Sequence, residues 1–187
     1  MRKILQSIVA LMHARALARL AHDRRGVSAV EFALLAPLMI GLYLSGVEIS
    51  QGIGIDRKVT ITAGAMANLV AQNTSVSDTD IATFFNAAST IMAPYSTTPL
   101  KVTVSCLSID STGKVTVSWS DTKGGTARAV GSVVSIPSAL AVPSTSIIFA
   151  EVSYGYTPTI GHTISGTLTL SDQMYMTPRQ SSTVKRT

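Results

Sequence analysis

The chain has 187 residues, enough for one modest domain with a core. Its hydrophobic content of 46% and mean hydropathy of +0.36 are high for a soluble domain. Residues 1–26 carry six basic side chains and one acidic one, which accounts for the whole net charge of +5, and the rest of the chain carries nine of each sign. The basic pI of 9.6 therefore does not indicate nucleic-acid binding, and we expect no nucleic acid among the partners.

Residues 1–26 form a basic leader that ends in Arg24, Arg25 and Gly26. Positive charges that flank a membrane helix stay on the cytoplasmic side, so Arg24 and Arg25 are expected to mark a cytoplasmic flank. Within the leader, residues 4–20 fit an amphipathic helix on the inner leaflet. A flexible basic segment with no role beyond topology is the alternative.

The next segment is apolar, and between Val27 and Ile49 only Glu31 and Glu48 are charged. A helix of this span rises about 34 Å, which matches a hydrocarbon layer of about 30 Å. We predict one transmembrane helix at residues 27–50, with the remainder of the chain outside the cytoplasm. A buried core helix is the alternative, but the rest of the chain is not apolar enough to surround one. The apolar run is too long for a secretory signal peptide, and no small-residue cleavage site follows it at the right distance.

The start of the apolar segment carries an ordered set of residues. Arg24-Arg25-Gly26 is followed by VSAVEF at 27–32 and by ALLAP at 33–37. This order resembles the signature of the TadE-like family, the pilin-related proteins of tight-adherence (Flp) pilus systems. The resemblance implies an α+β, type IV pilin-like fold, in which a long N-terminal transmembrane helix packs on a small antiparallel β-sheet head.

The resemblance also implies roles for residues. A membrane-embedded prepilin peptidase would cut between Gly26 and Val27 on the cytoplasmic face, and Glu31 would then dock subunits by neutralising the new amino terminus of a neighbour. The main Flp pilins typically carry tyrosine after this glutamate, whereas Phe32 follows it here, which favours a minor pilin or pseudopilin. In the alternative, Glu31 belongs to an uncleaved anchor and extends to the inner interface.

Pro37 and several small residues modify this helix. Pro37 lacks a backbone donor and clashes with the carbonyl of Ala33, so a kink or local melting is expected. Close approach of partner helices in lipid is favoured by small residues at four-residue spacings. These are Gly41, Ser45, Gly46, Ser50 and Gly54.

The chain beyond the membrane should form a head. Residues 51–75 are expected to continue the helix, because an apolar stripe recurs at spacings of four and three (Ile55, Val59, Thr62, Met66 and Leu69). Residues 76–187 are expected to form an α+β head that begins with a second helix capped by Ser77. Alternation predicts a four-stranded antiparallel sheet, with a turn at 110–113 and Val115, Val117 and Trp119 on one face of the second strand. The strands are Leu100–Ile109, Lys114–Ser120, Ile147–Tyr156 and Leu168–Met176, and a frayed tail at 181–187 follows them.

Few residues indicate catalysis. His162 is the only histidine in the exported part, and Ser111 and Lys114 satisfy an S-x-x-K motif only inside the predicted hairpin turn. We therefore expect no enzyme activity, no cofactor and no metal site. Cys106 is the only cysteine, so a thiol buried in a strand is expected, with an intermolecular disulfide as the minor alternative.

The sequence thus predicts a minor pilin or pseudopilin in the biogenesis of a tight-adherence pilus. Its expected location is the inner membrane, with a cytoplasmic N-terminus and a periplasmic or extracellular head that can enter the pilus. Its expected partners are membrane lipid, the prepilin peptidase, other pilins or pseudopilins and the assembly platform. The alternatives are an uncleaved membrane-anchored scaffold of the same apparatus and, more remotely, a membrane-tethered hydrolase built on Ser111, Lys114 and His162.

Overall fold

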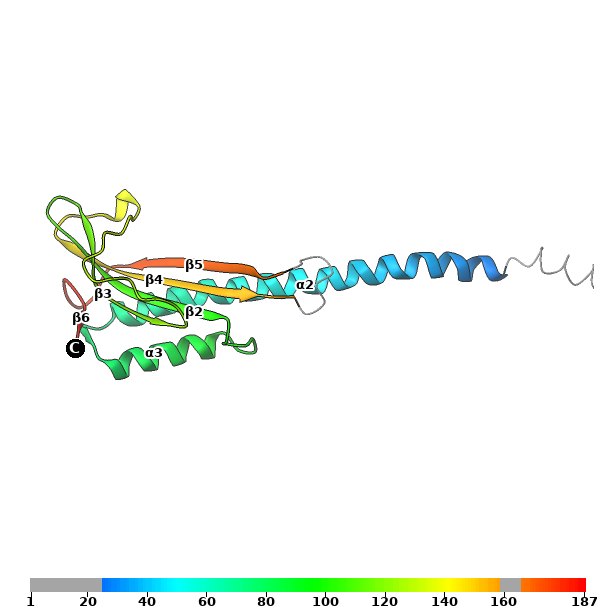
Figure 1. Ribbon diagram of the computed structural model, residues 1–187, viewed down its shortest axis with the longest axis horizontal. Helices are drawn as coiled ribbons and strands as arrows, with labels where there is room; N and C mark the ends of the chain where they lie inside the picture. The colour runs from blue at the N-terminus through cyan, green and yellow to red at the C-terminus, as the bar shows by residue number, and fades with distance from the viewer. Residues whose placement is uncertain (1–24, 159–165) are drawn as a thin grey trace, which may run out of the picture. The chain divides into compact units, whose positions relative to one another are not determined.

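The computed structural model describes residues 25–158 and 166–187 (Figure 1). The chain divides between Gly46 and Val47 into two compact units, which are described separately below. The helices are α2 (Arg25–Ala71), α3 (Asp78–Ile91) and the short 3-10 helix η1 (Ser138–Leu140). The strands are β1 (Ser75–Val76), β2 (Leu100–Ile109), β3 (Val115–Lys123), β4 (Thr145–Tyr156), β5 (Leu168–Met176) and β6 (Lys185–Arg186).

The first unit is described from Arg25 to Gly46, which is the beginning of α2. Helix α2 has 47 residues and includes Pro37. At 1.5 Å per residue it is about 70 Å long. The predicted boundaries for one continuous helix from the apolar segment to the head are confirmed to within a few residues.

The second unit is built on a four-stranded antiparallel sheet in the order β3-β2-β4-β5. The predicted bounds of β2 and β5 are confirmed, whereas β3 runs three residues further and β4 begins two residues earlier. The β2–β3 hairpin forms at the predicted turn, where the Asp110 carboxylate accepts hydrogen bonds from the backbone N–H groups of Thr112 (2.8 Å) and Lys114 (2.9 Å). Gly113 supplies the positive φ of 84° that the turn requires.

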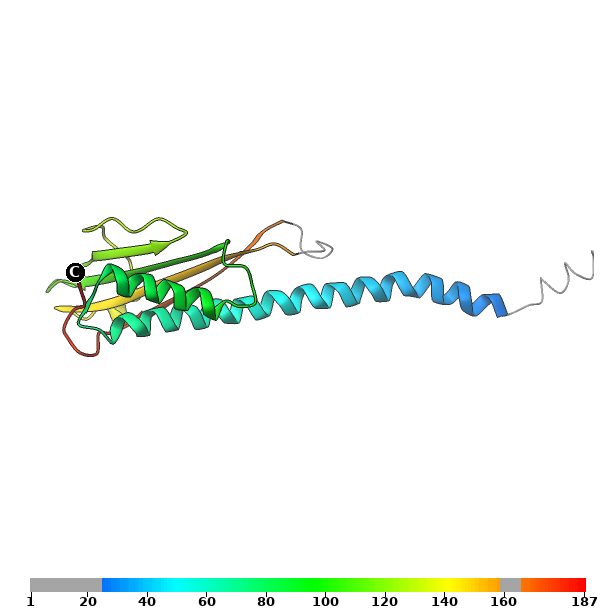
Figure 2. The ribbon, with the colours of Figure 1, turned by 90° about the horizontal axis from the view of Figure 1, so that it is seen from below.

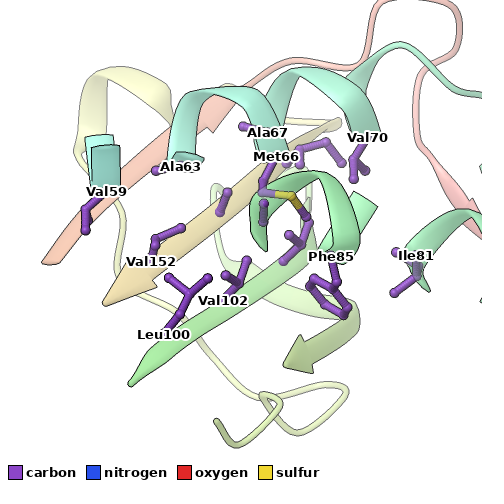
Figure 3. Packing of buried hydrophobic residues seen from close by; sticks show 14 of the residues in the cluster. Val59, Ala63, Met66, Ala67, Val70, Ile81, Phe85, Leu100, Val102 and Val152 are labelled. Carbon is purple, nitrogen blue, oxygen red and sulfur yellow. The ribbon is translucent and has the colours of Figure 1, made fainter. Parts of the chain in front are cut away.

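Helices α2 and α3 both cover one face of this sheet (Figure 2). The apolar stripe of α2 packs there as predicted, since Ile55, Val59, Thr62 and Met66 are fully or almost fully buried, although Leu69 is only partly covered. Figure 3 shows this packing, with Met66 among residues of α2, α3, β2 and β4. Burial of these apolar side chains is the main stabilising contribution to the head.

Helix α3 begins where the sequence predicts it. The Ser77 side chain accepts a hydrogen bond from the backbone N–H of Asp80, and the Asp80 carboxylate accepts one from the backbone N–H of Ser77 at 2.9 Å. The hydrogen bonds from Ser77 hold the pKa of Asp80 below its ordinary value. This capping box satisfies backbone donors at the start of the helix. Ile81, Phe85 and Ala88 then face the core.

The prediction that Trp119 shares a face of β3 with Val115 and Val117 is wrong. The pairing of β2 with β3 is irregular between Cys106 and Leu107, and Ser118 has no partner in the register. Trp119 therefore joins the main core under the helices, while Val115 and Val117 belong to a second apolar cluster on the opposite face. A β-bulge inserts one extra residue, so the side chains beyond it change face.

The predicted frayed tail is also wrong. Strand β6 pairs in parallel with β1, with Ser75 opposite Lys185, and Val184 is buried. The indole N–H of Trp119 donates to the carbonyl of Val184 at 2.8 Å. The C-terminal segment is ordered because it supplies a buried side chain and backbone hydrogen bonds to the head.

Arg186 holds β6 against two other elements. Its guanidinium donates to the Asp121 carboxylate on β3 at 2.8 Å and to the Asp78 carboxylate at the start of α3. It also donates to the carbonyl of Val76 at 3.3 Å. The hydrogen bonds that Arg186 donates to Asp121 and Asp78 raise the pKa of Arg186 further, the one to Asp121 most, and keep it charged.

The prediction of a buried thiol is confirmed. Cys106 is inaccessible in β2, and its sulfur lies 3.7 Å from the Thr183 hydroxyl. Burial raises the pKa of the Cys106 thiol, which keeps the unreactive protonated form.

Candidate membrane anchor and processing site

The first unit exposes its apolar side chains. Val27, Phe32, Leu34, Leu38 and Tyr43 are each between 51% and 73% exposed. Among the described residues, α2 is the one helix long and apolar enough to cross a membrane, and none of its most apolar stretch is buried within the protein. The alternative of a buried core helix is therefore wrong for this stretch. The helix is compatible with a single-pass membrane anchor.

Gly26 and Val27 lie in the first turn of α2, at the predicted processing site. Both are exposed, and a Cβ atom added to Gly26 would have no atom within 4 Å. Gly26 is not among the glycines with positive φ. Neither packing nor backbone conformation within the described part of the chain therefore requires glycine at this position.

Glu31 is exposed and lies four residues after Val27, so it is about 6 Å further along the helix axis. Phe32 is 70% exposed. A carboxylate and an aromatic ring thus occupy the exposed surface near the start of an apolar helix. Arg24 lies outside the described residues, and Arg25 is described only as the first residue of α2.

Helix α2 passes through Pro37 without interruption, so the helix does not melt there. The kink stays a prediction, since a proline removes one backbone hydrogen bond even where a helix continues. Further along, the Ser45 hydroxyl donates to the carbonyl of Gly41 at 2.8 Å, which satisfies a polar group within an apolar segment.

The second unit contains a polar cluster that the sequence analysis missed. Glu48 is only 2% exposed, and the Tyr156 hydroxyl donates to its backbone carbonyl at 3.1 Å. Burial, and then the Glu48 carboxylate and Tyr95, raise the pKa of Tyr156. Gly54 gives the Tyr95 hydroxyl room, because an added Cβ atom would lie 2.8 Å from that oxygen.

At Gly52 an added Cβ atom would lie 3.5 Å from the Tyr156 ring, which is an ordinary contact, so the fold does not require glycine there. Gly54 was therefore the available signal for this cluster. The sequence analysis instead assigned Gly54 to contacts between membrane helices.

The residues of the hydrolase alternative do not form a described site. Ser111 and Lys114 are exposed in the β2–β3 turn, and His162 lies outside the described residues. Within residues 25–158 and 166–187, no three Asp, Glu, His or Cys side chains gather in a way that could hold a metal ion.

The geometry defines an α+β protein with one exposed apolar helical segment and one folded head. Comparison with family models, with curated proteins and with solved structures found no match for this chain.

Proposed function

We propose that the protein is a minor pilin or pseudopilin of a tight-adherence pilus, stored in the inner membrane with its head on the outer side. The observation that carries the proposal is the change of environment along α2. Its first part exposes apolar side chains, with Glu31 near their start, whereas its second part packs into the head. A subunit that moves from lipid into a fibre needs such an exposed apolar helix and such a separately stabilised head.

In this proposal a prepilin peptidase cuts the Gly26–Val27 bond and releases the amino group of Val27. The exposed Glu31 carboxylate then pairs with the amino terminus of a neighbouring subunit, which compensates the cost of a charge in lipid. Phe32 packs beside it. Partner helices and the assembly platform occupy the surface that lipid covers before assembly.

The test is the intact mass of the protein isolated from native membranes, beside a Gly26→Leu variant. The proposal expects a mature form that begins at Val27 in the natural protein and full-length protein in the variant. Gly46→Leu is the matched control, because an added Cβ atom meets nothing within 4 Å at either glycine. Processing should continue in this control.

Full-length protein in all three samples would overturn the pilin mechanism and support the uncleaved scaffold. If processing is found, Glu31→Gln tests docking separately: the variant should be cleaved but should fail to enter the pilus fraction. Normal incorporation of Glu31→Gln would remove the proposed role of the carboxylate.

A further inference from the structure

The face of the sheet opposite the helices carries a groove. Val102 and Val104 of β2 face the core, and the alternate residues Lys101 and Thr103 face outward. A groove of about 790 Å³ lies there between β2, β4, β5 and residues 125–128, and we call it the sheet groove. Its volume is within the range of about 300–1,000 Å³ that is typical of small-molecule sites.

The lining of the sheet groove is polar and carries few charges. Its outward-facing charged side chains are Lys101, Arg128 and Glu151, whereas Asp172 lies opposite Val152 in the register and so shares the core face of the sheet. The remaining polar groups are neutral donors and acceptors: Thr103, Thr126, Ser153, Ser171 and Gln173. Apart from the Arg128–Glu151 ion pair, Lys101 is the one outward-facing charged side chain of this lining, which is too little charge to favour a polyanion, and a polar lining does not favour a lipid chain. It suits a neutral ligand that carries many hydroxyl groups.

Arg128 and Glu151 form a fixed pair in this lining. The guanidinium donates to the two carboxylate oxygens at 2.8 and 2.7 Å, and both side chains are about one third exposed. The hydrogen bonds that Arg128 donates to Glu151 raise the pKa of Arg128 further. Since the Nε and Nη2 groups of Arg128 already donate to Glu151, Arg128 cannot bind a phosphate through this pair of N–H groups. Its remaining N–H groups and the carboxylate lone pairs are left for hydroxyl groups.

A stacked pair of aromatic rings adjoins the groove. The rings of Phe149 and Tyr175 stack with centroids 4.6 Å apart, and Arg128 lies 5.3 Å from the centre of the Phe149 ring. A second hollow of about 490 Å³ is lined by both rings and shares Arg128, Glu151 and Gln173 with the sheet groove. The polar lining of the groove therefore borders the partly exposed ring of Tyr175, whereas the Phe149 ring is almost fully buried.

We propose that the sheet groove binds a neutral oligosaccharide of pyranose units. Its hydroxyl groups hydrogen-bond to Gln173 and to the Arg128–Glu151 pair, and the apolar face of a sugar ring lies against Tyr175. The hydrogen bond between the Thr103 and Thr122 hydroxyls, at 2.9 Å, holds part of the lining in place before binding. The inference goes beyond the proposed pilus function and does not rest on it, because it needs only the folded head.

The test is calorimetric titration of the full chain in lipid nanodiscs, which avoids detergents with sugar head groups. The probes are cellohexaose, maltohexaose and chitohexaose, each to about 10 mM, which detects a dissociation constant of about 1 mM. At least one should bind. Ser171→Trp should abolish this binding by filling the groove, and Gln173→Ala should weaken it about fivefold through loss of a hydrogen bond.

Two controls keep the outcomes distinct. Ser108→Trp makes the same change at an exposed position of β2 outside the groove and should leave binding intact. Near-ultraviolet circular dichroism checks that each variant keeps its fold. Absence of binding by all three probes would overturn the proposal, and so would binding that Ser171→Trp and Gln173→Ala leave unchanged. Binding of a sulfated heparin oligosaccharide in place of the neutral probes would also overturn it.

Discussion

The two parts of α2 have similar apolar residues but opposite surroundings. From Gly26 to Gly46 the large apolar side chains are mostly exposed, whereas from Val47 to Ala71 a stripe of them is buried against the head. The acidic residues differ in the same way, since Glu31 is exposed and Glu48 is buried. Apolar composition alone therefore does not determine what covers a helix. The period of the pattern does, because a stripe indicates one packed face and an apolar surface all around indicates lipid or partner helices.

The largest expected effect is on the free energy of unfolding, when one methionine in each part of α2 is replaced. Met66 is fully buried and Met39 is 64% exposed. Met66→Ala should lower the free energy of unfolding of the head by about 2–5 kcal/mol, because it leaves a cavity. Met39→Ala should leave that quantity unchanged. Denaturant unfolding of both variants in nanodiscs checks this, and equal losses would contradict the division.

Membrane insertion should be sensitive to changes in the first part of α2 and not to changes in the second part. Leu38→Lys places a charge at the middle of the exposed segment and should disfavour insertion by about 3 kcal/mol. Ile61→Lys, at a residue 58% exposed in the second part, should insert normally. The inserted fraction can be measured by protection of the head from added protease. Normal insertion of Leu38→Lys would argue against a membrane-spanning segment.

A smaller effect tests how β6 stabilises the head, on which the second part of α2 packs. Arg186→Ala removes the charged hydrogen bonds to Asp78 and Asp121, and should destabilise the head by about 1–3 kcal/mol. The neighbouring Lys185 is exposed, so Lys185→Ala should change stability by less than about 0.5 kcal/mol. Thermal unfolding compares the two, and indistinguishable variants would show that Arg186 contributes nothing measurable.

The smallest effect distinguishes two glycines of the same helix. Gly54→Ala should destabilise the head by about 1 kcal/mol, because the new methyl group displaces the Tyr95 hydroxyl. Gly46→Ala meets nothing and should stabilise the helix slightly. In the double variant Gly54→Ala with Tyr95→Phe, the loss should be recovered. If it is not, the hydroxyl contact is not the cause.

The sequence predicts the parts of the fold that depend on local patterns. The capping box at Ser77, the turn at Asp110 and the apolar stripe of α2 each need only a few neighbouring residues, and all three are confirmed. Trp119 was assigned to the wrong face because alternation assumes an uninterrupted strand, and a bulge leaves little signal in a single sequence. Strand β6 was missed because two residues carry no periodicity, and its partner β1 lies more than a hundred residues earlier.

The same limits apply to the candidate sites. Gly26 and Glu31 follow from a motif within a dozen residues, so they could be proposed from the sequence. The sheet groove combines side chains from three strands and a loop, and no spacing in the chain connects Thr126 with Gln173. The burial of Glu48 depends in the same way on the sheet, whose Tyr156 lies far along the chain.

The parallel pairing of β1 with β6 has a consequence for biosynthesis. The buried stripe of α2 emerges first, but the strands that cover it end at residue 176 and the pair that closes the head ends at residue 186. At about 5–20 residues per second, the ribosome needs roughly 5–20 s to add the intervening hundred or so residues. During this time the stripe lacks part of the sheet that covers it in the folded head. The newly made chain is therefore most vulnerable to aggregation and proteolysis before its last strand is delivered.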